Sequence, residues 1–221
     1  MNHRVAVPVA VAGSLATVVA GFAVPGPFGS ALFTPAPPTW NVTSGSLFGD
    51  DAFLWSGMPQ HPDSAVLRAV GERSYGDVAV RFDLRVDGLS TTARTPERDF
   101  DGVHVMLRYR SEEQAYFVSV SRRDGRFAVK RKTPGGPSNG GTYRTLAFLQ
   151  SSPLRGWHHV EASIRGDRTV TIALRVDGFG VLTAIDHVPA GTPATGRVGL
   201  RGDNCDFLVR DYHVGPVLTR L

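Results

Sequence analysis

The stretch Gly102-Val-His-Val-Met-Leu-Arg-Tyr-Arg110 is followed by Ala115-Tyr-Phe-Val-Ser-Val-Ser121 and Arg126-Phe-Ala-Val-Lys-Arg-Lys132, and all three runs alternate between two kinds of side chain. Successive side chains of a strand point to opposite faces, so each run predicts a strand with one apolar face. The predicted apolar face carries Val103, Val105, Leu107, Tyr109, Tyr116, Val118 and Val120. The opposite face would carry His104, Met106, Arg108, Arg110, Phe117, Ser119, Ser121, Ala128, Lys130 and Lys132.

The remainder of the chain from Trp40 onward has the same character. Short runs rich in β-branched and aromatic residues are separated by Gly, Pro, Asp or Asn, and Asp-Gly pairs at 87–88, 124–125 and 177–178 favour tight hairpins. Besides the three central runs, the predicted strands are 40–48, 52–56, 66–70, 76–86, 142–148, 157–164, 169–176, 180–185, 197–201 and 207–214. So many strands with tight turns predict an all-β fold, a two-sheet antiparallel β-sandwich of the jelly-roll type.

The N-terminus predicts export. A short basic start, Met1-Asn-His-Arg4, precedes a stretch without charge from Val5 to Val24, and Gly29-Ser-Ala31 offers a cleavage site for a signal peptidase. We expect a signal peptide or membrane anchor at residues 1–31, a Pro-rich spacer at 32–39 and one folded domain at 40–218. The protein would then be secreted or associated with the cell envelope, touching a membrane only through an uncleaved N-terminal segment.

Composition argues against nucleic-acid binding, disulfide bonding and cysteine-based metal sites. Of 221 residues, 24 are Lys or Arg and 20 are Asp or Glu, which gives a net charge of +4. This excess is small and no nucleic-acid-binding motif is present, so we expect no nucleic-acid partner. Cys205 is the sole cysteine, which excludes an intrachain disulfide and a thiolate metal cluster.

Several segments carry a family resemblance. The segments 156–178, 196–201 and 207–214 resemble the C-terminal half of the concanavalin A-like lectin/glucanase superfamily, and 40–47 and 102–109 resemble the same group. That superfamily includes laminin-G-like domains, family 16 glycosidases, keto-disaccharide hydrolase-like domains and polysaccharide lyases. The resemblance implies a concanavalin A-like sandwich in which the central strands of one concave sheet line a carbohydrate groove.

The polar face of the three central runs would lie in that groove. Arginine can hold a carboxylate or sulfate through two parallel hydrogen bonds, and an aromatic ring offers a flat apolar face to a sugar. Small residues from Pro134 to Tyr143 would allow a lip over the groove. We therefore predict an oligosaccharide or polysaccharide ligand, with acidic polysaccharide favoured. The predicted binding residues are His104, Arg108, Arg110, Phe117, Lys130, Lys132, Asn139 and Tyr143.

Catalysis stays open as an alternative. Glu97-Arg-Asp99-Phe-Asp101 is similar to the Glu-x-Asp-x-Glu signature of family 16 glycosidases but has Asp at the last position, so a solvated acidic loop is favoured. Lyases of the superfamily use a tyrosine with a histidine or arginine beside a uronate, and Tyr143, His104 and Arg108 are the candidates here, without a recognised motif. A structural or adhesion module without a sugar ligand is a third alternative.

One metal prediction follows from the resemblance. Asp211-Tyr-His-Val214 resembles the last-strand pattern from which some members present a calcium-ligating aspartate, assisted by backbone carbonyls near Gly45. We expect that no cofactor is required and that Asp211 is the candidate for a structural Ca²⁺ ligand. His158 and His159 have no third ligand nearby in the sequence, so packing is favoured for both.

Overall fold

The computed structural model describes residues 40–45, 47–49, 53–56, 66–189 and 192–217. The predicted leader and spacer lie outside this part of the chain, so their boundaries stay predictions. Every regular element in the described residues is a strand, and none of those residues forms a helix long and apolar enough to cross a membrane.

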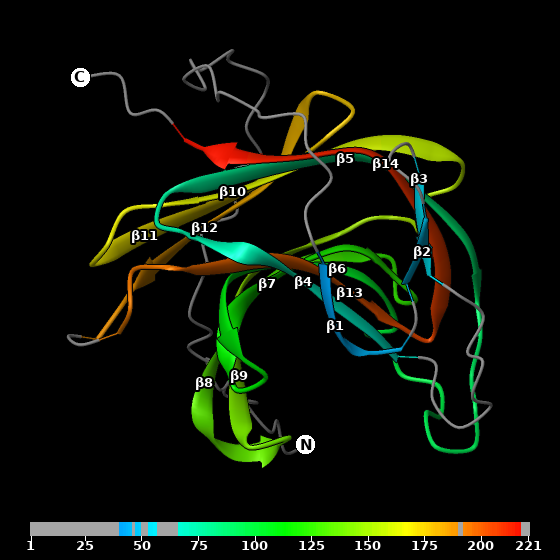
Figure 1. The fold of residues 1–221 in the computed structure, drawn as a ribbon, viewed down its shortest axis with the longest axis horizontal. Coiled ribbons are helices and arrows are strands. Elements are labelled where there is room, and N and C mark those ends of the chain that lie inside the picture. The colour runs from blue at the N-terminus through cyan, green and yellow to red at the C-terminus, as the bar shows by residue number, and fades with distance from the viewer. Residues whose placement is uncertain (1–39, 46, 50–52, 57–65, 190–191, 218–221) are drawn as a thin grey trace, which may run out of the picture.

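The strands form two sheets of seven, stacked as two layers (Figure 1). The first sheet has the order β1 (Trp40–Ser44), β4 (Val66–Tyr75), β13 (Gly196–Asp203), β6 (Gly102–Ser111), β7 (Gln114–Arg122), β8 (Arg126–Ser138), β9 (Gly141–Gln150). The second has the order β12 (Phe179–His187), β11 (Thr169–Val176), β10 (Trp157–Arg165), β5 (Val78–Leu89), β14 (Cys205–Pro216), β3 (Phe53–Ser56), β2 (Leu47–Gly49). The predicted all-β sandwich is confirmed, with antiparallel pairing such as β6 against β7 and β10 against β5.

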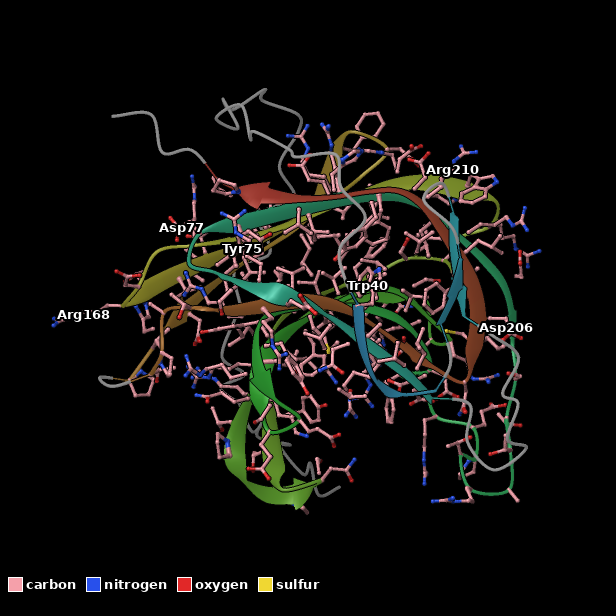
Figure 2. The ribbon with its side chains drawn as sticks, in the orientation of Figure 1. Trp40, Tyr75, Asp77, Arg168, Asp206 and Arg210 are labelled. Carbon is pink, nitrogen blue, oxygen red and sulfur yellow. The ribbon has the colours of Figure 1, made fainter. Side chains whose placement is uncertain are left out.

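The core lies between the two sheets and is built by period-two alternation. Phe82 and Leu84 of β5 face Val105 and Leu107 of β6 across this space, and all four are almost fully buried. Burying each such side chain stabilises the fold by about 1.5–3 kcal/mol. Trp40 lies between the layers (Figure 2) and packs against this core. Its ring centroid is 4.9 Å from that of Tyr212.

The first predicted strand, 40–48, divides into two. β1 pairs with β4 in the first sheet, whereas β2 pairs with β3 in the second sheet. Gly45, between them, has a φ of 73°, a left-handed conformation that glycine adopts without steric cost. The prediction of one continuous strand was wrong because hydrophobic alternation does not reveal a chain that crosses between sheets.

Strand β6 contains an irregularity that reverses the faces of its last residues. Arg108 has a φ of 48°, and the pairing of β6 with β13 shifts register by one residue between Met106 and Tyr109. A shift of one residue moves the following side chains to the other face. Tyr109, predicted for the core, therefore packs with Met106 and Phe117 in a second apolar cluster on the outer face.

The outer face of the first sheet is concave. In Figure 1 the β8–β9 hairpin bends away from the second sheet, and the segment between β5 and β6 extends in the same direction on the other side. These two projections flank the outer face of β13, β6 and β7. The first sheet thus curves toward the face on which sequence alternation placed the polar side chains.

Candidate ligand-binding pocket

A pocket of about 300 Å³ opens on this concave face. Its volume is at the lower end of the range for small-ligand sites in proteins. The side chains that line it come from β6, β7, β8, β9 and β13, from the segment before β6 and from the β8–β9 turn. They are Phe100, His104, Phe117, Ser119, Arg122, Lys130, Lys132, Ser138, Asn139, Tyr143, Arg201 and Asp203.

Strand register brings these side chains onto one face. His104 pairs with Arg201 of β13 on one side and with Ser119 of β7 on the other, so the three stand side by side. Directly opposed residues of neighbouring strands lie on the same face with Cβ atoms about 5 Å apart. In the same way Lys132 of β8 pairs with Tyr143 of β9.

Arg201 and Asp203 form the buried polar floor of the pocket. Arg201 Nε lies 2.9 Å from Asp203 Oδ1 and 2.8 Å from Oδ2, and Arg201 Nη1 donates to the Tyr143 hydroxyl at 3.2 Å. Burial alone would raise the pKa of Asp203, but the Arg201 guanidinium and His104 reverse this and lower it to about 2. The two charges therefore balance each other.

His104 links the floor to β7. Its Nδ1 lies 2.9 Å from Ser119 Oγ, and its Nε2 lies 3.3 Å from Asp203 Oδ2 without the alignment of a hydrogen bond. Burial lowers the pKa of His104 and outweighs the opposite effect of Asp203. The imidazole is therefore neutral near pH 7, with one nitrogen facing a hydroxyl and the other facing a carboxylate.

Lys130 and Lys132 supply the unbalanced positive charge. Their ammonium groups lie 6.0 and 5.1 Å from the centroid of the Tyr143 ring. Within the described part of the chain neither lysine has a carboxylate at ion-pair distance, whereas the pocket arginines Arg122 and Arg201 pair with aspartates. Burial lowers the pKa of both lysines. The pocket therefore has two cations that a bound anion would stabilise.

Aromatic rings form one wall. The Phe117 and Tyr143 rings meet edge to face with centroids 5.5 Å apart. Phe100 is exposed at the rim. Burial raises the pKa of Tyr143, so its hydroxyl stays protonated at neutral pH. The wall combines apolar ring surface with a hydroxyl group, a combination that suits a ligand with both C–H faces and polar groups.

The structure brings together six of the eight predicted binding residues, His104, Phe117, Lys130, Lys132, Asn139 and Tyr143. Arg108 lies elsewhere, because the register shift turns it toward the end of the sandwich. There it donates to the Gly76 carbonyl at 3.2 Å and the Gly166 carbonyl at 2.8 Å, and it pairs with Asp77 at 3.3 Å. Arg110 is exposed and donates to the Thr195 carbonyl at 3.3 Å. Neither arginine lines the pocket.

Sequence reasoning placed Ser119 on this face without naming it as a binding residue, and it did not single out Phe100, Arg122, Ser138, Arg201 and Asp203. A signal existed for two of them, since Val198 and Leu200 are buried in the core and the alternation therefore places Arg201 and Asp203 on the outer face. What the sequence does not show is that β13 lies next to β6, since these strands are far apart along the chain.

The three carboxylates of the segment before β6, Glu97, Asp99 and Asp101, lie outside the pocket lining. Glu97 is exposed and pairs with Arg123 at 3.1 Å, as expected for a solvated loop. Asp101 differs, because it is buried and accepts a hydrogen bond from the Arg98 backbone N–H at 2.9 Å. Its carboxylate thus fixes the turn that leads into β6.

The predicted calcium ligand lies on the second sheet. Asp211 is exposed on β14, has a φ of 52° and lies 4.0 Å from Arg210 Nε. Among the described residues no group of three or more His, Cys, Asp or Glu side chains could hold a metal ion. Calcium binding at Asp211 stays a prediction.

Comparisons with known proteins identify the fold. No family model and no curated protein matches the chain. The carbohydrate-binding module CBM66 from Bacillus subtilis superposes with a TM-score of 0.59 at 12% identity, covering 80% of this chain and 94% of the module. A Bacillus subtilis protein of unknown function with a galectin-like fold gives 0.54 at 14% identity over 82% and 91% of the two chains. The exoplasmic domain of VIP36, in its Ca²⁺/Man3GlcNAc-bound form, gives 0.52 at 14% over 82% and 85%. At these identities the likeness establishes a lectin-like two-sheet sandwich.

Proposed function

We propose that this protein is an exported carbohydrate-binding β-sandwich that recognises an acidic polysaccharide in the pocket on its concave sheet. The observation that carries the proposal is the pair Lys130 and Lys132, whose charges have no carboxylate partner in the described residues and stand beside the Tyr143 ring. Holding two ammonium groups partly out of water is unfavourable, and a bound carboxylate or sulfate would offset that cost.

The remaining lining suits a sugar ring. Phe117 and Tyr143 present apolar ring surface, and Ser138 at the end of β8 and Asn139 in the β8–β9 turn supply polar groups for hydroxyls. The fold likeness to a carbohydrate-binding module and to a lectin domain in a Man3GlcNAc-bound form supports the same ligand class. The basic start and uncharged stretch of residues 1–31 support export to the cell envelope or medium, with membrane contact through an uncleaved leader only.

A lyase of the same fold is the second candidate. Tyr143, Arg201 and His104 line one pocket, and Arg201 donates to the Tyr143 hydroxyl at 3.2 Å. A tyrosine that removes a proton works best when its pKa is low, yet burial raises the pKa of Tyr143. A retaining or inverting hydrolase needs two carboxylates, and Asp203 is the single one among the described residues lining the pocket. Binding is therefore favoured over either reaction.

Retention on immobilised polysaccharides tests the proposal. We expect the wild type to be retarded by polygalacturonate and similar acidic polymers more than by neutral ones, and less so as salt rises, because the contacts are ionic. The variant Lys130→Met/Lys132→Met keeps the methylene chains but removes both charges, and it should lose this retention. The matched control is Arg165→Met/Arg168→Met, which removes two exposed charges at the β10–β11 turn, where Arg168 marks the end of the sandwich in Figure 2.

Product analysis on the same polymers separates the candidates. A lyase would create unsaturated uronate ends that absorb in the ultraviolet, and a hydrolase would release reducing ends, whereas a binding protein does neither. Full retention of the lysine variant would contradict the pocket assignment. Absence of retention on every polymer by the wild type would favour the structural or adhesion alternative.

A further inference from the structure

Three side chains that line the pocket lie in the order of a nucleophile, a base and an acid. Ser119 Oγ lies 2.9 Å from His104 Nδ1, and His104 Nε2 lies 3.3 Å from Asp203 Oδ2. The residues come from three adjacent strands, β7, β6 and β13, and all three line the pocket. We propose that Ser119, His104 and Asp203 form a hydrolytic triad that removes small acyl esters from a carbohydrate bound in this pocket.

The distance between Ser119 and His104 meets the requirement of such a triad, and Asp203 lies within ion-pair distance of His104. A nucleophile and its base must lie within hydrogen-bond reach, at about 2.6–3.2 Å, and a third group must orient the base. In proteins without substrate these contacts are often longer than in the reacting complex, which fits the 3.3 Å between His104 and Asp203. His104 would carry its proton on Nε2, toward Asp203, leaving Nδ1 free to accept the Ser119 proton.

Burying Ser119, His104 and Asp203 makes the fold less stable than burying apolar side chains at the same positions would. The three side chains are almost fully buried, and His104 Nε2 has no hydrogen-bond partner among the described residues. An unsatisfied buried polar atom destabilises the folded state. Elsewhere on the concave face the same strands carry the apolar Met106 and Phe117. A polar trio at these positions, with one nitrogen that no described side chain satisfies, fits a pocket in which chemistry is performed.

Charge states agree with these roles. Arg201 keeps Asp203 ionised, since it lowers the pKa of that carboxyl to about 2 despite burial. Burial keeps His104 neutral near pH 7 and able to accept a proton. Lys130 pairs with Phe117, two residues from Ser119 on the same strand face, so its ammonium can reach the space above Ser119. That cation is available to stabilise the negative oxygen of a tetrahedral intermediate.

The reaction balances with water as the only co-reactant. Ser119 Oγ attacks the acyl carbon while its proton passes to His104 Nδ1. The intermediate then expels the sugar oxygen, which takes that proton from His104. Water attacks the acyl-Ser119 ester, gives its proton to His104, and Ser119 regains a proton as the carboxylic acid leaves. His104 contacts the reacting atoms, whereas Asp203 acts through His104 as a positioning residue.

Covalent labelling tests the nucleophile on the full chain. We expect a fluorophosphonate probe to add one adduct to the wild type, mapped to Ser119 by peptide mass spectrometry, and none to Ser119→Ala. p-Nitrophenyl acetate hydrolysis should fall about 10³-fold or more in Ser119→Ala and in His104→Gln. Ser121→Ala is the matched control, because Ser121 is a buried serine of the same strand that does not line the pocket. Asp203→Asn should slow labelling, and Asp203→Glu should restore part of the rate.

The acidic carbohydrate named as substrate rests on the proposed function, but the ester chemistry does not, so an O-acetylated acidic polysaccharide separates them. Acetate release by the wild type, absent in a Ser119→Ala variant that still binds the polymer, supports both. Binding without acetate release and without Ser119 labelling overturns the triad and leaves the binding site standing. Ser119-dependent hydrolysis of p-nitrophenyl acetate without polysaccharide binding supports the triad and overturns the proposed function.

Discussion

Removal of the Asp186 carboxylate should destabilise the fold more than removal of a solvent-exposed charge. Asp186 of β12 accepts hydrogen bonds from the Tyr116 hydroxyl at 2.8 Å and from Arg131 Nη1 at 2.7 Å. Tyr116 and Arg131 belong to the first sheet and Asp186 to the second, so this group joins the two sheets at one edge of the sandwich. The Asp186 side chain is 1% exposed and that of Arg131 is 11% exposed.

The magnitude follows from what Asp186→Ala would leave behind. Breaking a buried ion pair from one side costs about 3–5 kcal/mol, because the remaining charge is buried without a partner. For a domain of this size that corresponds to a fall in melting temperature of roughly 10 °C. Tyr116→Phe removes one hydrogen bond but leaves the ion pair, so it should cost about 1–2 kcal/mol.

Urea unfolding followed by tryptophan fluorescence measures these differences. The matched control is Asp87→Ala, which breaks an Asp–Arg pair with Arg85 whose side chains are 41% and 39% exposed. An exposed pair of this kind contributes little to stability, because solvent screens the two charges. A loss below 1 kcal/mol for Asp186→Ala, or an equal loss for Asp87→Ala, would refute the reasoning that burial makes this pair critical.

Three further predictions concern pH, backbone and metal. Because the folded-state pKa of Asp203, about 2, lies below the ordinary 3.8, its ionisation contributes stability above pH 4 that is lost as pH falls toward 2. Between pH 4 and pH 2 the free energy of unfolding of Asp203→Asn should therefore fall by about 2 kcal/mol less than that of the wild type. An equal fall in both proteins would disprove the assignment. Gly102→Ala should cost about 2–4 kcal/mol in urea unfolding, because Gly102 has a φ of 141° and a Cβ there would collide with the Ser121 carbonyl oxygen. Gly88→Ala, where a Cβ would meet no atom within 4 Å, should change stability by less than about 0.5 kcal/mol, and similar costs at both positions would contradict this account. If Asp211 ligates calcium, calcium should raise the melting temperature of the wild type and not of Asp211→Ala, and identical curves with calcium and with chelator would remove the metal.

The sequence predicted the sandwich because alternation is a local signal. The pattern in β5, β6 and β7 identifies both the strands and their buried faces, and the buried Val80, Val105 and Val118 agree with it. It failed at Arg108, where the left-handed backbone and the register shift reverse the faces. Nothing in the residue types around Arg108 indicates that shift, since it depends on how β6 pairs with its neighbours.

The candidate site was predictable where its residues are close in sequence. Lys130, Lys132 and Tyr143 belong to one hairpin, so alternation and a turn suffice to bring them together. Arg201 and Asp203 join them from a strand near the end of the chain. Their place beside His104 depends on sheet order, which is a long-range property that a single sequence does not encode in any local pattern.

The most direct test of the central claim changes the ligand and the protein together. Titration calorimetry would compare the tightest-binding uronate oligosaccharide with its carboxyl-reduced counterpart, in the wild type and in Lys130→Met/Lys132→Met. We predict that carboxyl reduction weakens binding to the wild type at least about tenfold, which is about 1.4 kcal/mol, and that the difference disappears in the lysine variant. Equal affinity of the wild type for both ligands, or a difference that survives in the variant, would contradict the claim that these lysines recognise an acidic sugar.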